Sequence, residues 1–226
     1  MPETRVVSAE RLGPYTRVAL ERTVAPGVAG QFHMLRVQRS DAFLARALSV
    51  VSIDAKTLTF LCQIGPGPLA LLGTPGTAVA IEGPFGQGFD VAAAGDRPLL
   101  VGGGFGVALL AGVSRALPTA ALVAGFRDAD AALAATLVPA MPQSIVFEPE
   151  RVVPDLNGVT SVFAAGPTAM MHAVAASARA ASIPVQVALE APMACGYGSC
   201  YGCVVTLDGE LKRLCVEGPV VDGARL

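Results

Sequence analysis

A chain of 226 residues is long enough for one large domain or two compact ones. Apolar residues make up 53% and charged residues 15%, a balance that excludes a disordered chain. The formal net charge is −2 without a block of Lys or Arg, so nucleic-acid binding is not expected. The N-terminus lacks the apolar core of a signal peptide, and Gly and Pro interrupt the long uncharged stretches. We therefore expect a cytoplasmic protein without a membrane partner.

Residues 1–95 consist of short strand-like runs separated by Gly and Pro, at 5–7, 16–20, 31–37, 48–51 and 57–63. Many short strands with such turns are typical of an antiparallel sandwich or barrel. Arg46-Ala47-Leu48-Ser49 begins one strand, where Arg46 could pair with a pyrophosphate and the region of Ser49 could hydrogen-bond an isoalloxazine edge. Taken alone, a surface arginine is an equally good interpretation of this motif.

From residue 96 the pattern changes to strands at 98–101, 120–126, 161–165 and 185–189 that alternate with helices at 107–117, 129–137 and 168–182. This alternation predicts a parallel, doubly wound sheet in residues 96–190. Two strand-to-helix junctions carry residue types that suit phosphate binding at a helix start: Gly102, Gly103, Gly104 and Gly106, then Gly166 and Pro167. The first run is not G-x-G-x-x-G, because residue 107 is Val, and tight loop packing is the alternative.

Four of the five cysteines lie near the C-terminus, at Cys195, Cys200, Cys203 and Cys215. The first three follow the C-x4-C-x2-C spacing of plant-type ferredoxins, and interleaved glycines let a loop wrap closely around a cluster. We predict a [2Fe–2S] cluster in a small module at 191–226, with a hairpin around 207–210. Zinc and disulfides are the alternatives; zinc favours paired C-x2-C knuckles, and disulfides need an oxidising compartment.

The remaining chemistry-bearing side chains form no catalytic set. Cys62 is expected to be an ordinary buried thiol, and His33 and His172 are assigned core or surface positions because neither has a Cys or carboxylate at catalytic spacing. No catalytic residue is predicted, which suits a protein whose cofactors carry the chemistry.

These segments, in this order, resemble the ferredoxin–NADP reductase superfamily and, within it, the electron-transfer subunits of dihydroorotate dehydrogenase B. The motifs that carry the resemblance are Gly30-Gln31-Phe32, Arg46-x-x-Ser49, Gly65-x-Gly67, the runs 83–89 and 100–106, Gly166-Pro167-x-x-Met170-Met171, and the cysteine segments 193–203 and 214–220.

The resemblance implies an FAD barrel in 1–95, an NAD-binding domain in 96–190 and a [2Fe–2S] module in 191–226. It also implies an FMN-containing dihydroorotate dehydrogenase catalytic subunit as partner in a heterotetramer, with electrons passing from FMN through the cluster and FAD to NAD in de novo UMP synthesis. The sequence leaves NAD versus NADP open. The flavin contacts carried over from the family are Arg46, Ala47, Leu48, Ser49, Phe60, Leu61, Cys62, Gly67 and Pro68.

Two departures from the family pattern concern the flavin. Ala47 replaces a usual Pro, and Pro68 replaces a usual Thr, so the hydroxyl and backbone N–H that a Thr offers phosphate are absent. We expect the pyrophosphate to be held differently, or less tightly, near Pro68.

Two rival interpretations remain. One is the flavin subunit of a ferredoxin-dependent NAD(P)H oxidoreductase or a cytosolic hydrogenase, although some of those carry a carboxylate at the position of Cys195. The other is a non-enzymatic redox sensor, which the nucleotide-binding half disfavours. The stretch 191–206 has no charged residue and includes Met193, Tyr197 and Tyr201, which predicts a protein interface beside the cluster.

Overall fold

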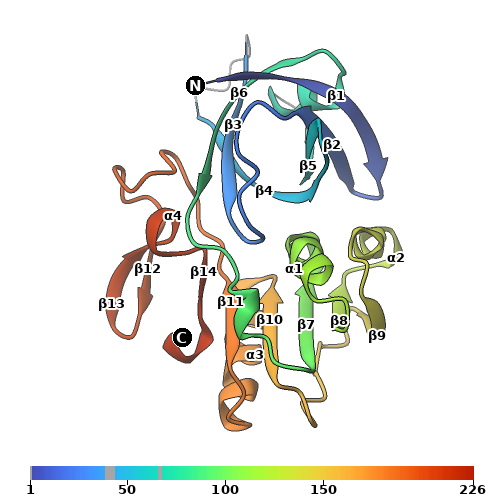
Figure 1. Cartoon of the computed structure of the whole chain (residues 1–226), viewed down its shortest axis with the longest axis vertical. Helices are drawn as coiled ribbons and strands as arrows, with labels where there is room; N and C mark the ends of the chain where they lie inside the picture. The colour runs from blue at the N-terminus through green and yellow to red at the C-terminus, as the bar shows by residue number, and fades with distance from the viewer. Residues whose placement is uncertain (1, 39–43, 66–67) are drawn as a thin grey trace.

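The structure, a computed structural model, describes residues 2–38, 44–65 and 68–226. Figure 1 shows three parts: a barrel (blue to teal), a helix-covered sheet below it (green to orange), and a small hairpin (red) beside the sheet.

The barrel closes from six antiparallel strands in the order β1-β2-β5-β4-β3-β6. Their bounds are β1 (Glu3–Leu12), β2 (Tyr15–Glu21), β3 (Phe32–Val37), β4 (Arg46–Ile53), β5 (Thr57–Cys62) and β6 (Ala78–Phe85). Alternate side chains fill the interior, where Leu58, Phe60 and Ile81 are at most 1% exposed. The predicted barrel is confirmed, and it contains one strand more than the sequence pattern indicated. The turn η1 (Pro68–Gly73) precedes β6, and η2 (Val91–Ala93) leads into the second part.

The sheet has five parallel strands in the order β11-β10-β7-β8-β9, with β14 antiparallel at the β11 edge. Their bounds are β7 (Pro98–Gly103), β8 (Ala121–Phe126), β9 (Met141–Phe147), β10 (Ser161–Ala165), β11 (Val185–Ala188) and β14 (Val220–Asp222). In β7, Leu100 faces one core, whereas Leu99 and Val101 face the other, because successive strand residues point to opposite faces.

Helices cover both faces of the sheet. One face packs against η3 (Gly104–Leu109), α1 (Leu110–Ala116), α2 (Ala129–Ala132) and η4 (Leu133–Leu137), and the other against α3 (Thr168–Ala180). The doubly wound sheet is confirmed. Within the ranges that the structure describes, no helix combines the length and apolar character needed to cross a membrane.

The tail forms a hairpin of β12 (Val204–Leu207) and β13 (Glu210–Arg213), followed by α4 (Leu214–Glu217), β14 and η5 (Gly223–Arg225). Asp208 and Gly209 make the turn with φ of 52° and 75°, both in the left-handed region that two-residue hairpin turns require. The predicted hairpin is confirmed. Within the segment expected to form the third part, residues 220–222 return to the sheet as β14.

The three parts share two hydrophobic cores. Tyr15, Val51 and Leu61 of the barrel belong to the same core as α1. Phe32 and Met34 of the barrel pack in the core that also holds Cys203, Cys215 and α3. Packing therefore fixes the relative placement of the three parts.

Candidate metal centre and cofactor cavities

The β12–β13 hairpin brings Cys203 beside Cys215. The intervening residues, 204–214, comprise the two strands, the two-residue turn and Leu214, so Cys203 and Cys215 flank the open end of the hairpin. The Leu214 N–H donates to the Cys203 carbonyl at 3.1 Å, and the Cys215 N–H approaches the Cys203 sulfur at 3.4 Å. The long third spacing of the motif, between Cys203 and Cys215, is thus the length of one hairpin.

Cys195 and Cys200 lie on a loop whose backbone turns sharply. Gly196, Gly198 and Tyr201 have φ of 83°, 86° and 57°. A Cβ on Gly196 would lie 2.6 Å from the Met34 Cγ of the barrel, so glycine is required for the close approach as well as for the φ.

Backbone N–H groups of this loop point at sulfur. Burial by itself raises the pKa of the Cys195 thiol. Hydrogen bonds to the sulfur lower it by more, so that the pKa falls to about 6. The backbone donors are Cys200, Tyr197 and Ser199. The Gly202 N–H lies 3.4 Å from the Cys200 sulfur. Such donors stabilise thiolates, the form that binds metal.

The four thiols form two neighbouring pairs. Cys195 is hydrogen-bonded to the Cys200 side chain, and Cys215 to the Cys203 side chain. Burial, followed by this hydrogen bond to Cys203, raises the pKa of Cys215 to about 12. Each iron of a [2Fe–2S] cluster takes two thiolates, and the two pairs of thiols match that requirement in number and in ligand type.

A cavity of about 290 Å³ lies between the barrel, the sheet and the cysteine loop. We call it the β4 cavity. Ala47, Leu48 and Ser49 form one wall, Phe105 of η3 another, and Met193, two residues before Cys195, a third. Its other lining residues are Phe32, Leu109, Leu189, Glu190, Ala191 and Pro219. Three of the residues predicted to contact flavin thus face the loop predicted to hold the cluster.

The other predicted flavin residues lie around or below this cavity. Arg46 is exposed, and its guanidinium donates to the Leu44 carbonyl at 3.4 Å. Phe60 and Cys62 point into the barrel core and Leu61 into the core under α1, so a contact with flavin there would involve backbone atoms. Burial raises the pKa of the Cys62 thiol to about 12. Pro68 begins η1, and Gly67 lies outside the described residues.

A second cavity, of about 470 Å³, lies at the carboxyl ends of the parallel strands and is called the sheet-edge cavity. Gly103, the last residue of β7, and Gly104 line it, and Pro167 lines it after β10. This is the edge at which open α/β sheets bind nucleotides. Arg127, Glu148, Glu150 and Arg151 line it where β8 and β9 end, and the barrel contributes Tyr15.

The remaining predicted glycines pack beneath this cavity. A Cβ on Gly106 would lie 2.6 Å from the Gly166 nitrogen, and one on Gly102 would lie 2.5 Å from the Val107 Cγ2. These glycines allow the loop after β7 to pack directly on the β10–α3 junction, and that contact positions Gly103 and Gly104.

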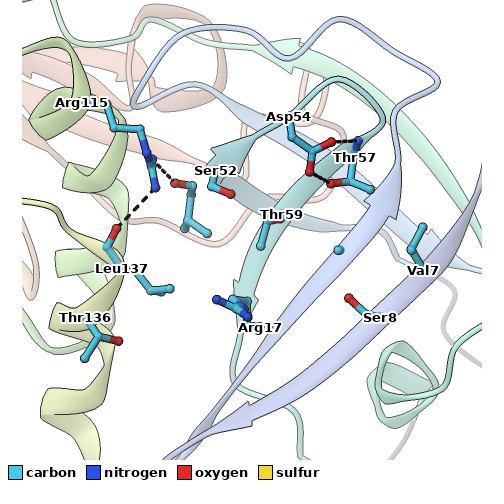
Figure 2. Close-up of a pocket in the computed structure, with 12 residues that line it drawn as sticks. Val7, Ser8, Arg17, Ser52, Asp54, Thr57, Thr59, Arg115, Thr136 and Leu137 are labelled. Atoms are coloured by element: carbon cyan, nitrogen blue, oxygen red, sulfur yellow. Dashed lines mark hydrogen bonds between the residues drawn. The ribbon is translucent and has the colours of Figure 1, made fainter.

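A third cavity, also of about 470 Å³, is shown in Figure 2 and contains none of the predicted cofactor residues. It lies between the barrel and the C-terminal end of α1, where Arg115 donates to the Val51 carbonyl at 2.6 Å and the Leu137 carbonyl at 3.5 Å (Figure 2). We interpret Arg115 as a residue that links the barrel to the helices on the sheet through these hydrogen bonds.

Sequence reasoning missed several cavity residues. Arg127 and Glu190 each directly follow a predicted strand, and position at a strand end was the available signal. Tyr15 and Glu148 reach the sheet-edge cavity only through tertiary folding, since β9 was not predicted and Tyr15 belongs to the barrel.

Comparisons with known proteins agree with this geometry. A family model described as the iron–sulfur cluster binding domain of dihydroorotate dehydrogenase B matches residues 190–226. The chain is 34% identical to the dihydroorotate dehydrogenase B (NAD(+)) electron transfer subunit of Bacillus caldolyticus, over 84% of this chain and 83% of that protein. Identity to the subunit of the same name from Geobacillus thermodenitrificans is 32%, with the same coverage of 84% and 83%.

The fold also matches a solved structure. An NADH-dependent reduced ferredoxin-NADP oxidoreductase, studied for flavin-based electron bifurcation, superposes with a TM-score of 0.79 and 21% identity. The match covers 100% of this chain and 90% of that one, so the whole chain shares that fold.

Proposed function

The chain belongs to the electron transfer subunits of dihydroorotate dehydrogenase B (NAD(+)), and on that premise we propose that it relays electrons from a dihydroorotate-oxidising catalytic subunit to NAD. The resemblance drawn from the sequence is confirmed. One observation carries the proposal: the strand that carries Ala47–Ser49 and the loop that carries Cys195 line one cavity. A flavin in that cavity lies next to the cluster ligands, as electron transfer between the two requires.

When bound, FAD and the [2Fe–2S] cluster would supply the redox chemistry, namely hydride exchange with NAD and transfer of single electrons. The protein's residues bind and orient these groups. Ala47, Leu48 and Ser49 present the β4 edge to the flavin ring, and the aromatic rings of Phe32 and Phe105 limit water in the β4 cavity. Gly103 and Gly104 offer backbone N–H groups to the nucleotide phosphates.

The surface around Cys200 supports docking of the catalytic subunit. Cys200 is exposed, and Tyr197 and Tyr201 nearby are 63% and 64% exposed. Tyrosines on an uncharged loop are typical of buried interface cores. We propose that an FMN-containing catalytic subunit covers this surface in a cytoplasmic heterotetramer that serves UMP synthesis.

The decisive experiment reconstitutes the chain anaerobically with a dihydroorotate dehydrogenase catalytic subunit. We expect dihydroorotate-dependent NAD reduction, one FAD, and about two iron and two sulfide per chain, as a [2Fe–2S] cluster requires. One zinc without sulfide would overturn the cluster assignment. NADH oxidation with an artificial acceptor but no dihydroorotate coupling in the complex would favour the ferredoxin- or hydrogenase-linked alternative. No activity with any acceptor would favour a redox sensor.

A further inference from the structure

The cavity between the barrel and the C-terminal end of α1 shares no lining residue with the β4 cavity or the sheet-edge cavity. We call it the Arg115 cavity. Its volume of about 470 Å³ lies within the range of about 300–1,000 Å³ that is typical of small-molecule sites. The outer face of β1, β2, β4 and β5 forms one wall, and Arg115 of α1 with Thr136 and Leu137 of η4 forms the other (Figure 2).

Two β-bulges turn serine side chains toward this cavity. The pairing of β1 with β2 shifts between Val6 and Ser8, and the pairing of β4 with β5 shifts between Val50 and Ser52. Val6 and Val50 face the barrel core, and a regular strand would point the residue two positions further on to the same face. Ser8 and Ser52 instead line the cavity. Bulges often occur next to functional sites, where they redirect a side chain.

Three hydroxyl groups of the cavity are available to a ligand. Within the described part of the chain, no hydrogen bond engages the side chains of Ser8, Ser52 or Thr59. Thr59 is only 9% exposed, so the cavity is where its hydroxyl meets water or a ligand. A hydroxyl group both donates and accepts hydrogen bonds, and it therefore suits the hydroxyl groups of a ligand.

Arginine supplies positive charge from both walls. Arg115 has five N–H donors, and two of them are engaged by backbone carbonyls. Arg17 of β2 is 47% exposed, and one of its nitrogens donates to Glu10, which lies outside the lining. Among the described residues of the lining, Asp54 supplies the one carboxylate, and both its oxygens accept hydrogen bonds from Lys56 and Thr57 of its own turn. Two guanidinium groups therefore remain to bind an anion, and guanidinium binds phosphate oxygens in pairs.

We propose that the Arg115 cavity binds a phosphorylated polyhydroxyl compound of the size of a sugar phosphate. The phosphate binds Arg17 and Arg115, and the hydroxyl groups of the ligand bind Ser8, Ser52 and Thr59. No aromatic ring is found among the described residues of the lining, so a nucleobase has nothing on which to stack. A ligand held by both walls links the barrel to the helices on the sheet and stabilises the folded chain. The inference does not depend on the proposed function, because the cofactor cavities use other residues.

The test measures binding of ribose 5-phosphate, inorganic phosphate and ribose to the FAD-loaded full chain by calorimetry. One ribose 5-phosphate should bind per chain, at least about tenfold more tightly than either of the other two probes, because only ribose 5-phosphate engages both the arginines and the hydroxyls. Its affinity should fall as salt is added. Saturating NAD should leave that affinity unchanged, because the sheet-edge cavity is separate.

Two variants test the two halves of the site. Arg17→Gln should lower the affinity for ribose 5-phosphate about tenfold. Thr59→Val keeps the shape of the side chain and should lower that affinity about threefold, while the affinity for inorganic phosphate stays the same. The matched control is Arg5→Gln, since Arg5 is also an exposed strand arginine paired with a glutamate, Glu3, but lies outside the lining. It should leave both affinities unchanged.

Four outcomes would overturn the inference. Ribose 5-phosphate fails to bind, or it binds no more tightly than inorganic phosphate, which would leave a simple anion site. Arg17→Gln behaves like Arg5→Gln, which would place the ligand elsewhere on the chain. NAD displaces ribose 5-phosphate, which would place it in the sheet-edge cavity. The proposed function stands in all four cases, because dihydroorotate-dependent NAD reduction is measured separately.

Discussion

Arg46 is the residue on which flavin affinity should depend most directly. Its guanidinium is exposed at the start of β4, beside the wall that Ala47–Ser49 give to the β4 cavity. Arg46→Ala removes a charge-assisted contact worth about 1.5–3 kcal/mol, so FAD affinity should fall about tenfold or more. Fluorescence titration of the apoprotein with FAD measures the change. Arg36→Ala, at an exposed position on the neighbouring β3, is the control, and equal affinities for the two variants would place the pyrophosphate elsewhere.

His33 should make stability depend on pH. Its ring is fully buried in the barrel, with Nε2 2.9 Å from the Ala25 carbonyl oxygen and, within the described part of the chain, no hydrogen-bond partner for Nδ1. Burial lowers the pKa of His33, so the folded state disfavours the protonated ring. The unfolded chain then binds the extra proton, and stability is full above about pH 6.5 and falls as the pH decreases toward the lowered folded value.

Urea unfolding at a series of pH values tests this expectation. His33→Leu should reduce the loss of stability below about pH 6.5, whereas the exposed His172→Leu should leave it unchanged. Equal pH profiles for the two variants would show that His33 does not titrate in this range.

At the scale of the elements, the hairpin turn should control retention of the cluster. A Cβ on Gly209 would meet nothing within 4 Å, but its φ of 75° strains any L side chain. Gly209→Val should therefore cost about 1–2 kcal/mol and loosen the approach of Cys203 to Cys215. Gly76→Val is the matched control, because Gly76 has a φ of 85° and equally open surroundings in a distant barrel turn.

Both variants should lose stability, and only Gly209→Val should lose iron faster to a chelator. This is followed through the visible absorption of the cluster. Identical rates of iron loss would mean that the hairpin does not hold the cysteines together.

Residue patterns predicted some elements well and others not at all. β7, β10 and α3 were predicted because a buried strand leads through Gly or Pro into a helix, and β8 was predicted because its apolar run is followed by a helical pattern. β6 was missed because Gly83-Pro84 looked like a turn, although the strand continues through both residues. β9, at the sheet edge, contains Pro142 and two polar residues, which leave an apolar run of only Ile145–Phe147 to mark it. The helix predicted to begin at Val107 begins instead at Leu110 as α1, because η3 (Gly104–Leu109) comes before it.

The four cysteines proposed as cluster ligands can be picked out by their spacing, because the loop and the hairpin that carry them are local segments of the sequence. The cavities could not, because each combines residues from distant segments. Phe105 and Met193 meet Ser49 only when the sheet docks on the barrel. The spacing of residues within one segment does not predict contacts between segments that lie far apart in the sequence.

At the scale of the whole molecule, Tyr201 should determine how tightly the chain binds the catalytic subunit. Its ring is 64% exposed, and Arg213 stacks on it at 5.2 Å while donating to the Gly198 carbonyl at 3.2 Å. Tyr201→Asp places a charge at the centre of the proposed interface, so affinity for the catalytic subunit should fall about tenfold or more. Dihydroorotate-to-NAD transfer should slow, while NADH oxidation with an artificial acceptor continues.

Val7→Asp is the control, since Val7 is 48% exposed on the distant strand β1. Binding and turnover are measured with the catalytic subunit at several concentrations. An unchanged complex in Tyr201→Asp would mean that the tyrosine only shields the cluster from water.

The return of β14 to the sheet has a consequence for how such a chain can arise and be re-engineered. β11 and β14 are neighbours, with Ala188 opposite Val220 and the Leu189 N–H donating to the Pro219 carbonyl at 2.9 Å. The segment 190–218 therefore leaves the sheet and re-enters it at one point, as an insertion between adjacent strands. Such an insertion can be gained or removed without rethreading the rest of the chain. The same junction offers a place to graft a redox module onto a reductase that lacks one.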